Sequence, residues 1–189
     1  MAAAFSFIVE TLLSLALFVV MARLLLQWTR ADFRNPLCQA VVRITNPVIL
    51  PLRRVLPPIG KLDTASVVAV LLVAAVDVAC LFALHGIGVP GPLAWIRLVL
   101  IEIARTLLWT YLYAIFLYAI LGLIAPGGYS PLQSVLTTLC EPVLRPIRRL
   151  IPTVAGLDLS PMWAIIAIYA ILILIRAVKC GASLVGAVG

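Results

Sequence analysis

Apolar residues are gathered into four long stretches, and polar residues are concentrated in the segments between them. A helix that crosses a hydrocarbon core of about 30 Å needs about 20 predominantly apolar residues. Four stretches approach or exceed this length, at residues 4–28, 64–84, 96–124 and 162–175, the last extending toward residue 177. We therefore predict an all-α membrane protein with four transmembrane helices, of which the third is longer than a span requires.

The two long polar segments carry a second pattern, in which apolar residues recur at helical spacing. In the first segment these residues are Leu37, Val41, Ile44 and Val48, and in the second they are Leu132, Leu136, Leu139 and Val143. Such segments are too short and too polar to span, but an apolar face can sink into the headgroup region. We predict one amphipathic interfacial helix in each segment. Pro47 and Pro142 are expected to break these helices, with Asn46 available to cap a new helix at Pro47.

Residues 46–58 recur 95 positions later as residues 141–153. The match extends outward to Pro36–Leu37 and Leu62–Asp63. The identical residues of the repeated segment, numbered as in the first copy, are Pro47, Val48, Pro51, Arg53, Arg54 and Pro57. Chance similarity between apolar segments would not align prolines, arginines and an aspartate. We interpret this as a duplication with repeats at 1–93 and 94–189. Each repeat would cross the membrane twice, which predicts parallel repeats related by a pseudo-twofold axis along the membrane normal.

Lysine and arginine residues indicate the orientation of the chain. Six lie between the first and second spans and three between the third and fourth. The positive-inside rule therefore places both polar segments in the cytoplasm and both termini in the periplasm, although Arg176 and Lys179 near the C-terminus oppose this. Arg23 lies close to the cytoplasmic end of its span, where its side chain can reach the membrane surface, so we expect a structural role for it.

Composition supports the membrane assignment. Of 189 residues, 65% are hydrophobic and 11% are charged, whereas soluble domains are about a quarter charged. The net charge of +7 is distributed beside apolar segments, which favours anionic lipid headgroups over nucleic acid as the partner. The four cysteines, at positions 38, 80, 140 and 180, lack metal-ligand spacing and are interpreted as small apolar filler.

The duplicated prolines and arginines are the candidate binding residues. They are Pro47, Pro51, Arg53 and Arg54 in the first copy and Pro142, Pro146, Arg148 and Arg149 in the second. One interpretation is a docking surface for lipid or for a protein partner in the cytosol or membrane. The other is that the arginines only orient the chain. Duplication of the prolines favours docking, because orientation alone does not require them.

A second candidate cluster lies inside the spans, where charges usually face the bundle interior. Its members are Glu10, Asp77, Glu102 and Arg105. Helical rise places all four at similar depth in the outer half of the bilayer. Because Glu10 and Arg105 are 95 positions apart, we expect them to pair across the pseudo-twofold axis, with Asp77 or Glu102 as a second partner. The cluster would either lock the helices together or serve transport.

The sequence contains no glycine-rich phosphate loop, HExxH pattern or nucleophile elbow. We therefore expect no enzyme activity, no catalytic residues, no cofactor and no metal site. A pore would require a homo-oligomer, because the spans contain few polar residues.

The segment Trp28–Pro36, followed by Thr45–Val48, Pro51–Arg54 and Leu62–Asp63, resembles the YggT family, also called YlmG, in its two-repeat proteobacterial form. The second copy departs from the first at Glu141 and Arg145. The resemblance implies a bacterial inner-membrane protein without catalytic residues. It also implies links to cell division, envelope organisation and osmotic-stress tolerance, and in plastid relatives to cytochrome maturation or nucleoid distribution.

Two functions follow as hypotheses. The first is a membrane scaffold or assembly factor whose cytoplasmic segments bind lipid and a protein partner. The second is a small ion-flux or transport component that acts in osmotic adaptation.

Overall fold

The computed structural model describes residues 2–56, 63–86, 88, 90–124, 130–150 and 158–186. Within them the chain forms six helices: α1 (Ala2–Trp28), α2 (Pro36–Val55), α3 (Thr64–His85), α4 (Pro92–Ile124), α5 (Pro131–Leu150) and α6 (Ser160–Gly186). The helices α1, α3, α4 and α6 are long and apolar enough to cross a membrane, which confirms the four predicted spans. Pro57, Lys61 and Leu62 of the repeated segment, and the counterparts Pro152 and Leu157, lie outside the described residues.

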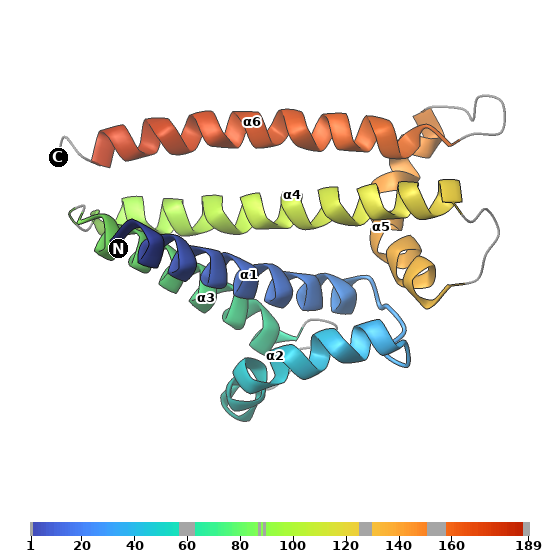
Figure 1. Cartoon of the computed structure of the whole chain (residues 1–189), viewed down its shortest axis with the longest axis horizontal. Coiled ribbons are helices and arrows are strands. Elements are labelled where there is room, and N and C mark those ends of the chain that lie inside the picture. Colours follow the sequence, from blue (N-terminus) through green and yellow to red (C-terminus); the bar gives the residue numbers. More distant parts are fainter. Residues whose placement is uncertain are drawn as a thin grey trace.

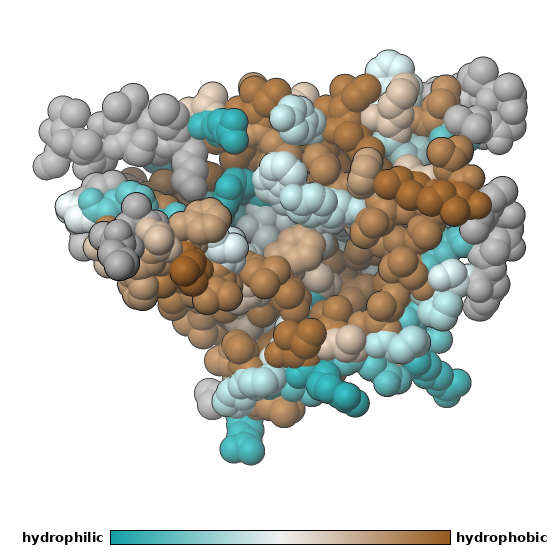
Figure 2. All heavy atoms as spheres, in the orientation of Figure 1, coloured by the Kyte–Doolittle hydropathy of each residue, from teal (hydrophilic) through white to brown (hydrophobic). Residues whose placement is uncertain are grey.

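The polar helices lie at one end of the bundle. The N-terminus of α1, the C-terminal end of α6 and the junction between α3 and α4 lie at the other end (Figure 1). Hydrophobic side chains cover most of the visible face, and hydrophilic residues gather along its lower edge over α2 (Figure 2). This separation leaves an apolar body with a polar end.

Packing between the helices is not symmetric. The helix α1 packs on α3, and α4 packs on α6, so each long helix pairs with the next long helix in the chain. The helix α4 also contacts both α3 and α1, whereas α6 and α1 make no contact of comparable extent in the described residues. Small residues permit the close approach of α3, because Ala65, Ala69 and Ala74 are all fully buried.

The polar helices pack against different neighbours. The helix α2 rests on α1 and α3, α5 rests on α4 and α6, and the two polar helices touch each other. The apolar stripes expected on them differ in environment. Leu37, Ile44 and Val48 of α2 are exposed, whereas Leu136 and Leu139 of α5 are buried in the bundle.

The prediction that proline ends these helices is wrong. The helix α2 continues through Pro47 and Pro51, and α5 continues through Pro142 and Pro146. Proline removes one backbone donor and crowds the preceding turn, which bends a helix when the flanking turns remain paired. Each ribbon accordingly changes direction along its length (Figure 1).

The N-terminal cap of α2 is Asn35 and not Asn46. The Oδ1 atom of Asn35 accepts a hydrogen bond from the backbone N–H of Leu37 at 3.0 Å, and Pro36 occupies the first turn. Proline fits there because its missing N–H would lack a helical partner in any case. The Asn35 amide also donates to the carbonyl of Pro131 at 2.6 Å, which links the starts of α2 and α5.

Candidate functional site

Two arginine–aspartate pairs connect the polar helices to the long helices that follow them. The Arg53 guanidinium donates to Asp63 Oδ2 at 2.5 Å, and Arg148 Nε donates to Asp158 Oδ2 at 2.9 Å. Each aspartate stands at the start of a long helix, where the helix dipole favours negative charge. The two pairs are 95 positions apart in the sequence, as are the polar helices α2 and α5.

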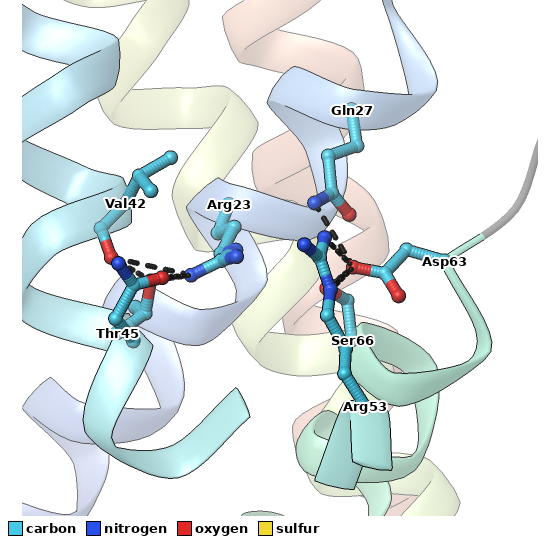
Figure 3. Close-up of polar contacts among 8 residues, drawn as sticks. Arg23, Gln27, Val42, Thr45, Arg53, Asp63 and Ser66 are labelled. Carbon is cyan, nitrogen blue, oxygen red and sulfur yellow. Dashed lines mark hydrogen bonds and ion pairs between the residues drawn. The ribbon is translucent and has the colours of Figure 1, made fainter. Parts of the chain in front are cut away.

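Asp63 is the centre of the first pair. Its Oδ2 atom also accepts hydrogen bonds from Gln27 Nε2 at 3.1 Å and Ser66 Oγ at 2.8 Å (Figure 3). Burial raises the pKa of the Asp63 carboxyl, but hydrogen bonds from Arg53, Ser66 and Gln27 outweigh it and hold the pKa below the ordinary value. One ionised carboxylate therefore fastens α1, α2 and α3 together.

Arg23 forms a second group of contacts beside Asp63. The side chain is 2% exposed, and its Nη1 atom donates to Thr45 Oγ1 at 2.6 Å, Asn46 Oδ1 at 3.0 Å and the carbonyl of Val42 at 3.2 Å. Figure 3 shows Arg23 directed from α1 toward α2. These contacts join α1 to α2 and so agree with the expected structural role, but the side chain does not reach the membrane surface, because α2 covers it and supplies acceptors.

The corresponding place in the second half has different chemistry. Tyr118 stands 95 positions after Arg23, and its hydroxyl accepts a hydrogen bond from Arg148 Nη2 at 2.8 Å. The Arg148 guanidinium also lies 5.9 Å from the Tyr118 ring centre and 3.4 Å from Glu141. Arg148 is therefore surrounded by a phenol and two carboxylates, whereas Arg23 is bound by neutral acceptors.

The predicted proline and arginine residues divide into two groups. Arg53 and Arg148 are ion-paired. Arg54 and Arg149 are exposed and make no hydrogen bond or ion pair with another described residue. The four prolines are exposed as well; they are Pro47, Pro51, Pro142 and Pro146.

The predicted pair between Glu10 and Arg105 is wrong, whereas the contact between Arg105 and its expected second partner, Glu102, is confirmed. Arg105 contacts Glu102, with Nε 2.9 Å from Oε1, and Glu10 instead approaches His85 at 3.6 Å. The local pair forms because residues three apart share a helix face. Asp77, the remaining member of the predicted cluster, is partly buried on α3.

A cavity of about 430 Å³ opens beside Arg23 and is lined by residues of α1, α2 and the connection between them. The lining residues are Arg23, Gln27, Phe33, Gln39, Val42, Arg43, Asn46 and Arg53. Among the residues that the structure describes, no group of three or more His, Cys, Asp or Glu could hold a metal ion. This cavity was not predicted from the sequence. A signal was present, because Arg23 is a charged residue within a span and the second copy has a tyrosine at the corresponding position.

The buried thiol of α5 allows a test of this packing. Cys140 is fully buried, and burial raises the pKa of its thiol to about 12. Because the thiolate is the reactive form, its population at pH 8 should be about 10³ times lower than for an ordinary thiol. In a variant with Cys140 as the sole cysteine, we expect maleimide labelling to be at least ~100-fold slower in the folded protein than in dodecyl sulfate. Equal rates would show that α5 does not pack as described.

Four apolar helices of spanning length, with two polar helices folded against one end, define a multi-pass membrane protein. The model of the CCB3/YggT family matches residues 2–84 and 98–178, and the chain belongs to this family. An uncharacterized protein of Pseudomonas aeruginosa is 39% identical over 163 residues, which cover 86% of this chain and 83% of the relative.

The protein YggT of Escherichia coli (strain K12) is also similar, being 36% identical over 166 residues that cover 88% of this chain and 86% of the relative. Neither relative's name states an activity. No solved structure matches the chain.

Proposed function

We propose that this protein is a bacterial inner-membrane scaffold or assembly factor, linked to cell division or envelope organisation, without catalytic activity. Its docking platform consists of the exposed Arg54 and Arg149 with the exposed prolines of α2 and α5. The platform faces the cytoplasm, and both termini face the periplasm. Its partners are anionic lipid headgroups and a protein of the cytosol or membrane.

The observation that carries this proposal is the joint position of the two polar helices. They touch each other at one end of the bundle, and Asn35 of α2 binds the backbone of Pro131 at the start of α5. The ion pairs of Arg53 and Arg148 fix each helix, while Arg54 and Arg149 stay exposed beside them. Paired fixed helices with exposed cations suit recognition of an acidic surface.

An interfacial position of α2 is supported by its two faces. Cys38, Thr45 and Ile49 are buried, whereas the neighbouring Ile44 is 66% exposed. An exposed apolar stripe beside arginines matches the boundary between acyl chains and headgroups. The 95-residue offset between α2 and α5 and the two stretches matched by the family model support two parallel repeats.

In vivo photo-crosslinking tests the platform. A photoreactive residue replaces Arg54, Arg149 or, as the control at the opposite end, Leu93, which is 72% exposed. We expect the same protein to be captured from positions 54 and 149 and not from position 93. If position 54 or position 149 captures no specific protein, the result would contradict the proposed scaffold function.

Ion flux in osmotic adaptation is the alternative, and the buried Glu102 carboxylate within α4 is the observation that favours it. Its contact with Arg105 supports a structural role instead, because the pair compensates its own charge. Liposomes reconstituted with the protein separate the two functions. Flux that disappears in Asp77→Asn or Arg105→Gln would favour transport.

A further inference from the structure

The cavity beside Arg23 has the composition of an anion site. Its polar lining consists of three arginines, at positions 23, 43 and 53, and three amides, at positions 27, 39 and 46. Among the residues that the structure describes, no aspartate or glutamate lines it. Asp63 binds Arg53 and Gln27 and so holds two lining residues in place. Its volume of about 430 Å³ lies within the usual range for small-ligand pockets, about 300–1,000 Å³.

Arg23 carries a buried charge that has no ion-pair partner of its own in the described part of the chain, because the nearby Asp63 is bound by Arg53. Within the described residues no aspartate or glutamate oxygen lies within 4.0 Å of it, and its contacts are neutral oxygens. The Nε atom of Arg23 is buried and has no hydrogen-bond partner. A buried guanidinium with an unused N–H is costly unless an acceptor, preferably an anion, completes its environment.

We propose that this cavity binds an anionic phosphate group, with Arg23, Arg43 and Arg53 as the cationic ligands. The planar guanidinium presents paired donors that match phosphate oxygens. Glutamine and asparagine amides contribute neutral donors, and Phe33 and Val42 provide apolar wall for the carbon portion of a phosphate ester. The phosphate belongs either to a lipid headgroup or to a free soluble anion.

This site goes beyond the docking platform. It lies between α1 and α2 of the first half, and the exposed Arg54 and Arg149 do not line it. Phosphate binding in the cavity therefore does not depend on whether the platform recruits a protein.

The second half supplies a natural comparison. At the positions 95 residues later, Tyr118 replaces Arg23, Thr138 replaces Arg43 and Glu141 replaces Asn46. The remaining cation, Arg148, already contacts Asp158 and Glu141. Arg53 is likewise paired with Asp63, so the unpaired positive charge of the cavity comes from Arg23 and Arg43, which the second copy replaces with the neutral Tyr118 and Thr138.

The test measures binding by isothermal titration to the full-length protein in a neutral detergent. One arm adds inorganic phosphate and the other adds short-chain phosphatidylglycerol below its micellar concentration. The principal variant is Arg43→Thr, because Arg43 is exposed and makes no hydrogen bond or ion pair with a described residue. The matched control is Arg97→Gln, which removes the same charge from an exposed residue outside both the cavity and the docking platform.

We expect Arg43→Thr to weaken binding about tenfold or more, because it removes a charged hydrogen-bond donor. Arg97→Gln should change affinity less than twofold. Binding of inorganic phosphate would assign a free anion, and binding of phosphatidylglycerol alone would assign a headgroup. Absence of binding in both arms, or equal losses in the two variants, would overturn the site. Arg23→Tyr adds a second check, with loss of binding expected in whatever fraction remains folded.

Discussion

Replacing Asp63 with asparagine should lower the free energy of unfolding by about 2 kcal/mol. Breaking a fully buried ion pair costs about 3–5 kcal/mol. The loss expected here is smaller than that range because solvent screens the pair: the Arg53 side chain is 42% exposed, and only the Asp63 side chain, at 9%, is buried. The change leaves Arg53 without its carboxylate, close to the buried Arg23. It should lower the thermal midpoint by about 4–8 °C for a chain of this size.

The buried cysteines provide the measurement. Cys38 and Cys140 are fully buried, so a fluorogenic thiol reagent reports unfolding in detergent as they become accessible. Asp158→Asn is the matched control, and its carboxylate is more exposed, because the Asp158 side chain is 33% accessible and that of Asp63 is 9% accessible. We expect a loss of about 1 kcal/mol or less there. Equal losses at the two aspartates would contradict the central role assigned to Asp63.

The pKa of Asp63 also fixes the pH dependence of this loss. The folded-state pKa is lowered, so the charge of Asp63 stabilises the protein above the unfolded value of about 3.9. This stability is lost as the pH falls through the lower, folded-state pKa. The difference between wild type and Asp63→Asn should therefore be constant near neutral pH and shrink in acid.

Replacing Ala69 with leucine should destabilise the protein by about 3 kcal/mol. Ala69 is fully buried in α3, which packs against α1, α2 and α4. Extra side-chain volume at such a close approach forces the helices apart or distorts rotamers, which costs about 1–3 kcal/mol. The upper end applies because leucine adds three carbon atoms. The thermal midpoint should fall by about 6–12 °C, as measured by the same thiol reagent.

Val76→Leu is the control for this change, because Val76 lies on the same helix and is 48% exposed. It should alter the midpoint by no more than about 2 °C. A similar loss from both substitutions would show that the helix packing described for α3 is incorrect.

Hydropathy predicted the four long helices because their length and apolar character are local properties. The polar helices were also predicted, but the effect of their prolines was not. Proline excludes a backbone hydrogen bond wherever it occurs, and whether the helix ends or bends depends on the neighbouring turns. For Pro47 and Pro142 those turns stay helical.

The polar contacts were harder to predict because they depend on which helices meet. The repeated arginines and aspartates were visible in the sequence, but their mutual pairing depends on how α2 and α5 fold back. Arg23 was misplaced because its acceptors, Thr45 and Asn46, belong to a helix whose position no periodicity reveals. Glu10 and Arg105 were paired by assumed symmetry, whereas the closer Glu102 satisfies Arg105.

The hydrogen bond from Asn35 to the Pro131 carbonyl has a consequence for biogenesis. The two residues are 96 positions apart, so the ribosome completes the first partner long before the second. The start of α2 therefore waits for its final contact until α5 has been synthesised and has folded onto the same end of the bundle. Insertion of the second half is thus the step that completes the contacts of the first half. In a chain arrested before residue 131, the side-chain amide of Asn35 would instead donate its hydrogen bond to water.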